Sequence, residues 1–192
     1  IEWARVEPEE GEFSYASLEH YRRMLATCQE HGIAPMVTLH HFTSPRWLIR
    51  EGGWLDEKTP ERFARYCERV TKHLGDLIST ACTINEANIS ALLSKLMKKK
   101  KKKQTWWQVA SQAFGVSTDR LGVFMFSDPV RSRETILSAH RPAFDALHSG
   151  SSNFPVGMTL ALPDIQHVEG GESAAAAIRH EIGDLYLETL GK

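Results

Sequence analysis

The sequence of 192 residues has few cysteines, no long apolar run and no excess of charge of either sign. Its three cysteines, Cys28, Cys67 and Cys82, are far apart in apolar helix or strand patterns, so we expect reduced core residues rather than disulfides or metal ligands. No segment approaches the roughly 18 apolar residues of a membrane helix, and no signal peptide is visible. We therefore expect a cytoplasmic protein that has no membrane partner.

Charge and phosphate-binding motifs are also missing. The 23 basic and 24 acidic side chains nearly cancel, so a small neutral ligand suits the chain better than nucleic acid. Neither G-x-G-x-x-G nor G-x-x-x-x-G-K-[ST] follows any expected strand, which disfavours a nucleotide-binding sheet. We expect no cofactor and no metal ion. His40 and His41 are adjacent, and adjacent strand residues point to opposite faces, so they form a poor metal pair.

Apolar strand patterns alternate with helical patterns along the chain. We expect strands at residues 1–6, 34–39, 81–84 and 153–162. Helices are expected from Ser14, from Thr59 as the capping residue, from Ser127-Asp128-Pro129 and after Gly171. This alternation implies right-handed crossovers and a parallel sheet, which is either an open doubly wound sheet or part of an eight-stranded barrel.

Residues 98–103 are six consecutive lysines. Like charges at neighbouring positions repel, so we expect a mobile, solvated loop inside a single domain that spans residues 1–192. A nucleic-acid binder that used this run would show steep salt dependence. The run has no interleaved aromatic or glycine residues, and we favour the surface loop.

The most informative segment is ACTINEAN at residues 81–88, a short apolar run that ends in an amide, a carboxylate and a second amide. In α/β proteins the functional side chains gather where parallel strands end. Asn85 and Glu86 are expected at such an end, and the strand at 34–39 delivers His40 and His41 to the same edge. On this pattern alone, Glu86 is more often a solvated carboxylate than a catalytic one.

Four segments together resemble one known family. They are residues 1–8 (IEWARVEP), 37–42 (VTLHHF) with Pro45, 52–54 (GGW) and 83–86 (TINE). In this order and spacing they resemble glycoside hydrolase family 1, the β-glucosidase family. The resemblance covers almost the whole chain. It implies part of a (β/α)₈ TIM barrel, in which the expected strands are the second to fifth and the first and the sixth to eighth are absent.

The resemblance also implies roles for three residues. Glu86 would be the general acid/base, Asn85 would bind the 2-hydroxyl of the glycone, and His41 would contact a glycone hydroxyl. The family usually has proline after the catalytic glutamate and often Trp-Asp after the histidine, where this chain has Ala87 and Phe42-Thr43. Neither departure removes a reacting group.

A retaining glycosidase needs two carboxyl groups about 5–5.5 Å apart, one as proton donor and one as nucleophile. The family's nucleophile lies in a Thr-Glu-Asn-Gly motif, which this sequence lacks. Glu169 and Glu172 follow the last expected strand, and we interpret them as loop and first-turn residues favoured by the helix dipole.

We therefore expect an incomplete piece of a retaining β-glucosidase. The small saccharide substrate would be a β-glucoside or a related sugar. The nucleophile would lie outside this chain, the separate piece would be inactive, and the sequence specifies no oligomeric state. The alternative is a non-catalytic sugar-binding or structural half-barrel.

Three tryptophans, Trp3, Trp47 and Trp54, have faces suited to packing on a sugar ring. For Trp3 and Trp54 we favour packing inside the protein. For Trp47 both interpretations stay open.

Overall fold

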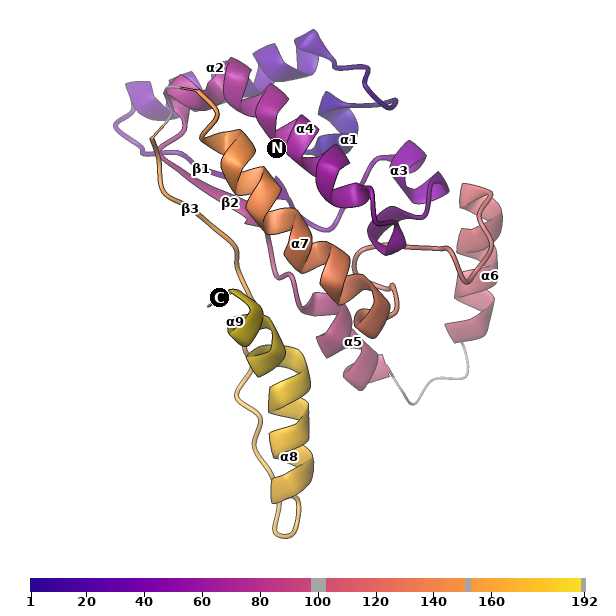
Figure 1. Ribbon diagram of the computed structural model, residues 1–192. Helices are drawn as coiled ribbons and strands as arrows, with labels where there is room; N and C mark the ends of the chain where they lie inside the picture. Colours follow the sequence, from indigo (N-terminus) through magenta and orange to yellow (C-terminus); the bar gives the residue numbers. More distant parts are fainter. Residues whose placement is uncertain (98–102, 151–152, 191–192) are drawn as a thin grey trace.

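A computed structural model describes residues 1–97, 103–150 and 153–190, which form a small parallel sheet flanked by helices (Figure 1). The strands, in their spatial order, are β1 (Met36–His40), β2 (Thr80–Ile84) and β3 (Val156–Gly157). The helical segments are α1 (Trp3–Val6), α2 (Tyr15–Glu30), α3 (Arg46–Arg50), η1 (Gly53–Leu55), α4 (Thr59–Leu74), η2 (Gly75–Leu77), α5 (Ile89–Met97), α6 (Lys103–Phe114), α7 (Pro129–Leu147), α8 (Glu172–Arg179), η3 (His180–Asp184) and α9 (Leu185–Leu190).

The three strands run parallel, as the alternation of strands and helices predicted. His40 of β1 pairs with Ile84 of β2, and Ala81 of β2 pairs with Val156 of β3. Consecutive strands are joined through helices, because parallel neighbours cannot be connected by a tight turn. The register brings the carboxyl ends of β1 and β2 to the same level.

Helices α4 and α7 pack side by side over the sheet (Figure 1). Apolar residues recur at helical spacing along α4 and form a fully buried stripe, with 0% exposure for Phe63, Cys67, Val70 and Leu74. These residues belong to one large core cluster that also contains Ile136 and other residues of α7. Burial of each large apolar side chain stabilises the fold by about 1.5–3 kcal/mol, so this stripe holds the helical layer on the strands.

The helix starts were predicted with mixed success. Helix α2 begins just after Ser14 and α7 just after Asp128, as expected, and both side chains cap their helices by accepting backbone hydrogen bonds. Thr59 is not a cap: α4 begins at Thr59 itself, and Lys58 occupies the cap position. The Thr59 hydroxyl donates instead to the carbonyl oxygen of Gly53 at 2.6 Å, so it ties the helix to the preceding turn.

The expected strand at residues 1–6 is wrong, because Trp3–Val6 form the single-turn helix α1. The amide of Glu7 donates to the carbonyl of Trp3 at 2.8 Å, and the indole Nε1 of Trp3 donates to Oε2 of Glu7 at 2.7 Å. Six alternating residues are too few to separate one helical turn from a strand. Only Ile1 lies along the sheet, where its nitrogen donates to the carbonyl of Thr38 at 2.9 Å.

The expected strand at residues 153–162 is shorter than predicted. Only Val156–Gly157 form β3, and the chain then runs on in extended form past the end of β2. There the amide of Thr159 donates to the carbonyl of Ile84 at 3.2 Å, and the amide of Ala87 donates to the carbonyl of Thr159 at 3.0 Å. Beyond β3, the extended segment therefore bonds to the last residue of β2 and to the residues that follow it.

All three cysteines are free, as predicted, but they differ in burial. Cys67 and Cys82 are buried, and burial raises the pKa of both thiols. Cys28 is only half-buried, so its assignment to the core is wrong. It lies on α2, where Leu18 is the one fully buried residue.

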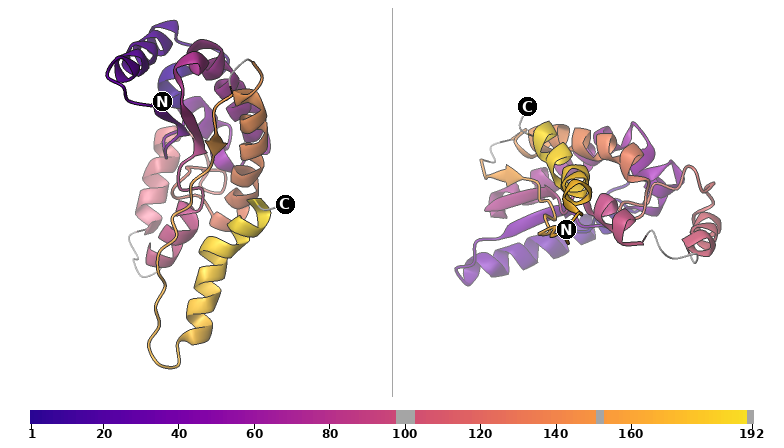
Figure 2. Two further views of the ribbon diagram at one scale, coloured as in Figure 1. Left: turned by 90° about the vertical axis from the view of Figure 1, so that its left-hand side faces the viewer. Right: turned by 90° about the horizontal axis from the view of Figure 1, so that it is seen from below.

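The expected last helix forms an arm that projects away from the sheet (Figures 1 and 2). Helix α8, the π-helical turn η3 and α9 run back beside the extended segment that follows β3. The buried side chain of Asn88 joins both limbs: its Nδ2 donates to the carbonyls of Ala161 (2.7 Å) and Ile182 (2.5 Å), and its Oδ1 accepts from the Ala161 amide (2.8 Å). Asn88, which lies four residues after the end of β2, thus anchors the arm to the sheet.

Most of the lysine run, residues 98–102, lies outside the described residues, while Lys103 begins α6. The mobile loop at 98–103 and the single domain at 1–192 therefore stay predictions. Within the described ranges, no helix combines the length and hydropathy needed to cross a membrane.

Candidate active site

The predicted site residues follow directly on the carboxyl ends of two paired strands, at one rim of the sheet. β1 ends at His40 and β2 ends at Ile84, and the backbone amide of Asn85 donates to the carbonyl of His40 at 2.9 Å. His41 and Asn85 are therefore the first residues beyond two paired strands. Glu86 follows directly, so a histidine, an amide and a carboxylate leave the sheet at the same level.

Both strands leave the sheet through a left-handed residue. Among the described non-glycine residues, only Phe42 (φ 70°) and Glu86 (φ 48°) have positive φ, and each lies two positions beyond the paired His40 and Ile84. This conformation costs roughly 1–2 kcal/mol for a residue with a side chain. Such strain persists only where neighbouring contacts hold it, and it concentrates at functional sites.

The contacts that hold the Glu86 corner come from Thr159. The Glu86 amide donates to Oγ1 of Thr159 at 2.9 Å, and the same hydroxyl donates to Oδ1 of Asn85 at 3.0 Å. Together with its backbone bonds to Ile84 and Ala87, Thr159 contacts four consecutive residues. Sequence reasoning missed Thr159, because it lay unmarked inside an apolar strand pattern.

A cavity of about 650 Å³ lies beside the rim. The exposed His41 lines it, and its ring contacts the Phe42 ring at a centroid distance of 4.6 Å. The other lining residues are mostly apolar: Ile1, Glu2, Trp3, Tyr21, Leu39, Thr43 and Met125. Glu86 is half-buried.

The two adjacent histidines have different surroundings, as expected for neighbours on a strand. His40 is buried against Trp54 and Phe124, with ring centroids 4.7 and 4.4 Å away. Burial lowers the pKa of His40 to about 3, so its ring is neutral at physiological pH. Its Nε2 lies 3.1 Å from Oγ of Ser44. Of the pair, only His41 is available to a ligand.

All three candidate tryptophans are buried, although Trp3 borders the cavity beside the rim. Trp3, Trp47 and Trp54 are 1%, 6% and 0% exposed. Their indole nitrogens donate to Oε2 of Glu7, to the carbonyl of Glu7 and to Oγ of Ser44, respectively. Packing inside the protein is therefore confirmed for Trp3 and Trp54. Trp47, for which both interpretations were open, also packs inside the protein.

The two acidic residues after the last strand lie away from the rim. Glu172 is in the first turn of α8, as predicted, and Glu169 is exposed in the preceding turn. The start of α8 is at the outer end of the arm, far from the strand ends (Figure 1). Neither carboxylate is placed to act together with Glu86.

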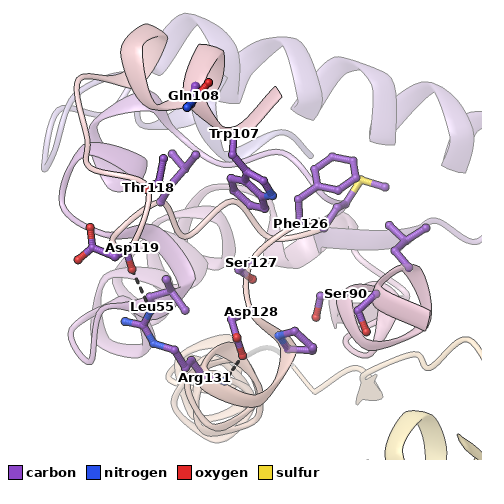
Figure 3. A pocket seen from close by; sticks show the side chains of 15 residues that line it. Leu55, Ser90, Trp107, Gln108, Thr118, Asp119, Phe126, Ser127, Asp128 and Arg131 are labelled. Atoms are coloured by element: carbon purple, nitrogen blue, oxygen red, sulfur yellow. Dashed lines mark hydrogen bonds between the residues drawn. The ribbon is translucent and has the colours of Figure 1, made fainter. Parts of the chain in front are cut away.

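A second cavity, of about 500 Å³, lies between α5, α6 and the start of α7 (Figure 3). Trp107 and Phe126 line it together with Asp119, Asp128 and Arg131. These polar groups are already engaged: Nη1 of Arg131 donates to the carbonyl of Asp119 at 2.9 Å, and its backbone amide donates to Oδ1 of Asp128 at 3.1 Å. The strand rim therefore remains the candidate site.

Comparison with known proteins supports the resemblance that the sequence motifs suggested. The family model for glycosyl hydrolase family 1 matches residues 1–166. Beta-glucosidase A of Acetivibrio thermocellus is 35% identical over 98 residues, which is 50% of this chain and 22% of that protein.

Solved structures show the same relationship over nearly all of the chain. The crystal structure of beta-glycosidase BGL167 is 46% identical with a TM-score of 0.92, over 98% of this chain and 46% of that one. The beta-glycosidase from Pyrococcus horikoshii is 27% identical with a TM-score of 0.74, over 98% and 40%. The chain thus spans less than half of these proteins, and the expected partial (β/α)₈ barrel is confirmed. This chain belongs to glycosyl hydrolase family 1.

Proposed function

We propose that the complete protein carrying this chain hydrolyses β-glycosidic bonds, with a β-glucoside or a similar small saccharide as substrate. The observation that supports the proposal is the position of His41, Asn85 and Glu86 in the backbone just beyond the paired carboxyl ends of β1 and β2. Family membership supports it, since the relatives described above are named β-glucosidases and β-glycosidases. The reaction needs no cofactor.

Glu86 is the proposed general acid/base. In the first step its protonated carboxyl group gives a proton to the glycosidic oxygen while the bond from that oxygen to the anomeric carbon breaks. A second carboxylate takes the anomeric carbon as a covalent ester. Glu86, now ionised, then removes a proton from the water that hydrolyses this ester, so the anomeric configuration is retained. Asn85 and His41 bind glycone hydroxyls, for which amide and imidazole groups are suited.

We place the nucleophile outside residues 1–192. The sequence has no Thr-Glu-Asn-Gly motif, and Glu169 and Glu172 lie in the arm. A single carboxylate cannot be proton donor and nucleophile in the same step. The separate chain is therefore inactive in this proposal, while the complete protein is active.

The test is hydrolysis of aryl β-glucosides by the complete protein and its Glu86→Gln variant. For p-nitrophenyl β-glucoside we expect kcat to fall by about 10²- to 10⁴-fold, the usual contribution of a general acid/base. With 2,4-dinitrophenyl β-glucoside, whose leaving group needs no proton, the glycosylation step should lose far less. Glu169→Gln is the matched control because that residue is exposed in the arm and should keep full activity.

Two results would contradict the proposal. Full activity of Glu86→Gln on both substrates would remove Glu86 from the mechanism. Formation of the α-anomer as the first product, followed by NMR, would replace retention by inversion. The cytoplasmic location and the single domain at residues 1–192 are also proposals, and cell fractionation and limited proteolysis would test them.

A further inference from the structure

Thr159 makes an unusual set of contacts for a residue outside any regular strand. Its amide donates to the carbonyl of Ile84, and its carbonyl accepts from the amide of Ala87. Between these two bonds its hydroxyl accepts from the Glu86 amide at 2.9 Å and donates to Oδ1 of Asn85 at 3.0 Å. Four bonds therefore connect one threonine to the whole corner that carries the proposed acid/base.

The direction of the two hydroxyl bonds follows from the chemistry of the partners. A backbone amide can only donate, and an amide oxygen can only accept. In the structure the Thr159 hydroxyl donates its proton to Oδ1 of Asn85, while a lone pair receives the N–H of Glu86.

This bonding fixes the orientation of the Asn85 side chain. Its oxygen is occupied by Thr159, and within the described part of the chain its Nδ2 makes no hydrogen bond. An unconstrained amide could turn either its oxygen or its NH₂ group to a ligand. Thr159 removes that freedom and leaves the two N–H donors of Asn85 available.

We propose that Thr159 is a positioning residue that makes Asn85 a hydrogen-bond donor to the substrate and holds the left-handed corner at Glu86. The inference rests on the proposed glycosidase function and deepens it. The family resemblance implies that the glycone oxygen opposite Asn85 is the one at position 2, so the favoured glycone carries an acceptor there. A sugar without that oxygen leaves the oriented donor unpaired and is rejected.

Two substitutions separate the hydroxyl from the rest of the residue. Thr159→Val keeps the branched shape and both backbone bonds but leaves the Glu86 amide and Oδ1 of Asn85 without this partner. Thr159→Ser keeps the hydroxyl. Thr83→Val is a matched control in β2, because its hydroxyl contacts His140 and Gly157 rather than the corner.

The kinetic test compares p-nitrophenyl β-glucoside with its 2-deoxy analogue in the complete protein. Thr159→Val should lower kcat/KM for the glucoside by about 10-fold, the effect of one ordinary hydrogen bond. It should lower the value for the 2-deoxy substrate much less, so the preference for the 2-hydroxyl shrinks. Thr159→Ser and Thr83→Val should keep the wild-type preference. Equal losses on both substrates, or none, would overturn the inference.

A second measurement does not depend on catalysis. Hydrogen exchange of the amides at residues 85–88, followed by mass spectrometry, should be faster in Thr159→Val and unchanged in Thr159→Ser. Unchanged exchange in Thr159→Val would disprove the proposal that Thr159 holds the backbone corner at Glu86. If the wild-type protein cleaves no β-glycoside, the proposed function and the specificity of Asn85 both fail, while the exchange data still decide whether Thr159 holds the corner.

Discussion

The carboxylate of Glu7 is fully buried and forms an ion pair with the Arg65 guanidinium, which is 38% exposed. Its other contacts are with Nε1 of Trp3 (2.7 Å) and the backbone amide of Gly11 (2.8 Å). One side chain thus links α1, the following turn and α4. A buried carboxylate is tolerated only with such partners, so Glu7 is a structural residue rather than a second catalytic acid.

Replacing this carboxylate should destabilise the fold. In Glu7→Gln the new NH₂ group faces donors, and Arg65 loses its counter-charge, so we expect the free energy of unfolding to fall by about 2–4 kcal/mol. Urea unfolding measures the change. Glu68→Gln, in the exposed pair with Lys72, is the control and should change stability by less than about 0.5 kcal/mol. Equal effects of the two substitutions would contradict this prediction.

His40 should make the fold sensitive to acid. Its pKa is lowered to about 3 by burial, whereas the unfolded chain takes up this proton near pH 6.5. Between these pH values the unfolded state binds more protons, so the free energy of unfolding falls as pH falls, by up to about 1.4 kcal/mol per pH unit. His40→Phe lacks this contribution. Thermal unfolding between pH 7 and 4 should give a flatter profile for the variant, and parallel profiles would refute the assignment.

Gly122 should tolerate no side chain. A Cβ atom there would lie 2.0 Å from the carbonyl oxygen of Gly52 and 2.8 Å from the amide nitrogen of Leu55, and backbone atoms cannot rotate away. We expect Gly122→Ala to cost about 3 kcal/mol of stability. Gly150→Ala is the matched control, since no atom lies within 4 Å of the added methyl group. Similar midpoints of chemical unfolding for both variants would show that the loop can shift freely.

The hydrogen bonds of Asn88 should hold the arm in place. Asn88→Ala removes three hydrogen bonds to Ala161 and Ile182 in a buried place, at a cost of about 2–3 kcal/mol. Because the lost bonds hold the arm, hydrogen exchange should accelerate in η3 and α9 more than in α4. The exposed Asn153→Ala is the control and should leave exchange in the arm unchanged. A uniform acceleration over the whole chain would show that Asn88 supports global stability only.

Sequence patterns predicted the elements that depend on local signals. Asp128 followed by proline marks the start of α7, and the apolar period of α4 marks its buried face. The site at the ends of β1 and β2 was also accessible, because parallel strands deliver successive polar residues to one edge. The motif around Glu86 was recognisable from the sequence alone, because its residues are consecutive.

Features set by distant contacts were not predictable in this way. Glu7, which follows α1, pairs with Arg65, which lies 58 residues away, and the six-residue pattern at the start of the chain gives no sign of this contact. Thr159 is 73 residues from Glu86, and nothing in its own segment distinguishes it from a strand residue. Thr59 has the side chain of a cap, but it is the first residue of α4, and its hydroxyl donates to the Gly53 carbonyl.

The left-handed backbone conformation at Glu86 restricts which residues can replace it during evolution. Branching at Cβ strongly disfavours that conformation, so valine, isoleucine and threonine would be strained at position 86. Asparagine, aspartate and glycine fit the bend with ease. A homologue that has lost catalytic activity can therefore carry one of these residues at position 86 and keep the same backbone conformation at this corner.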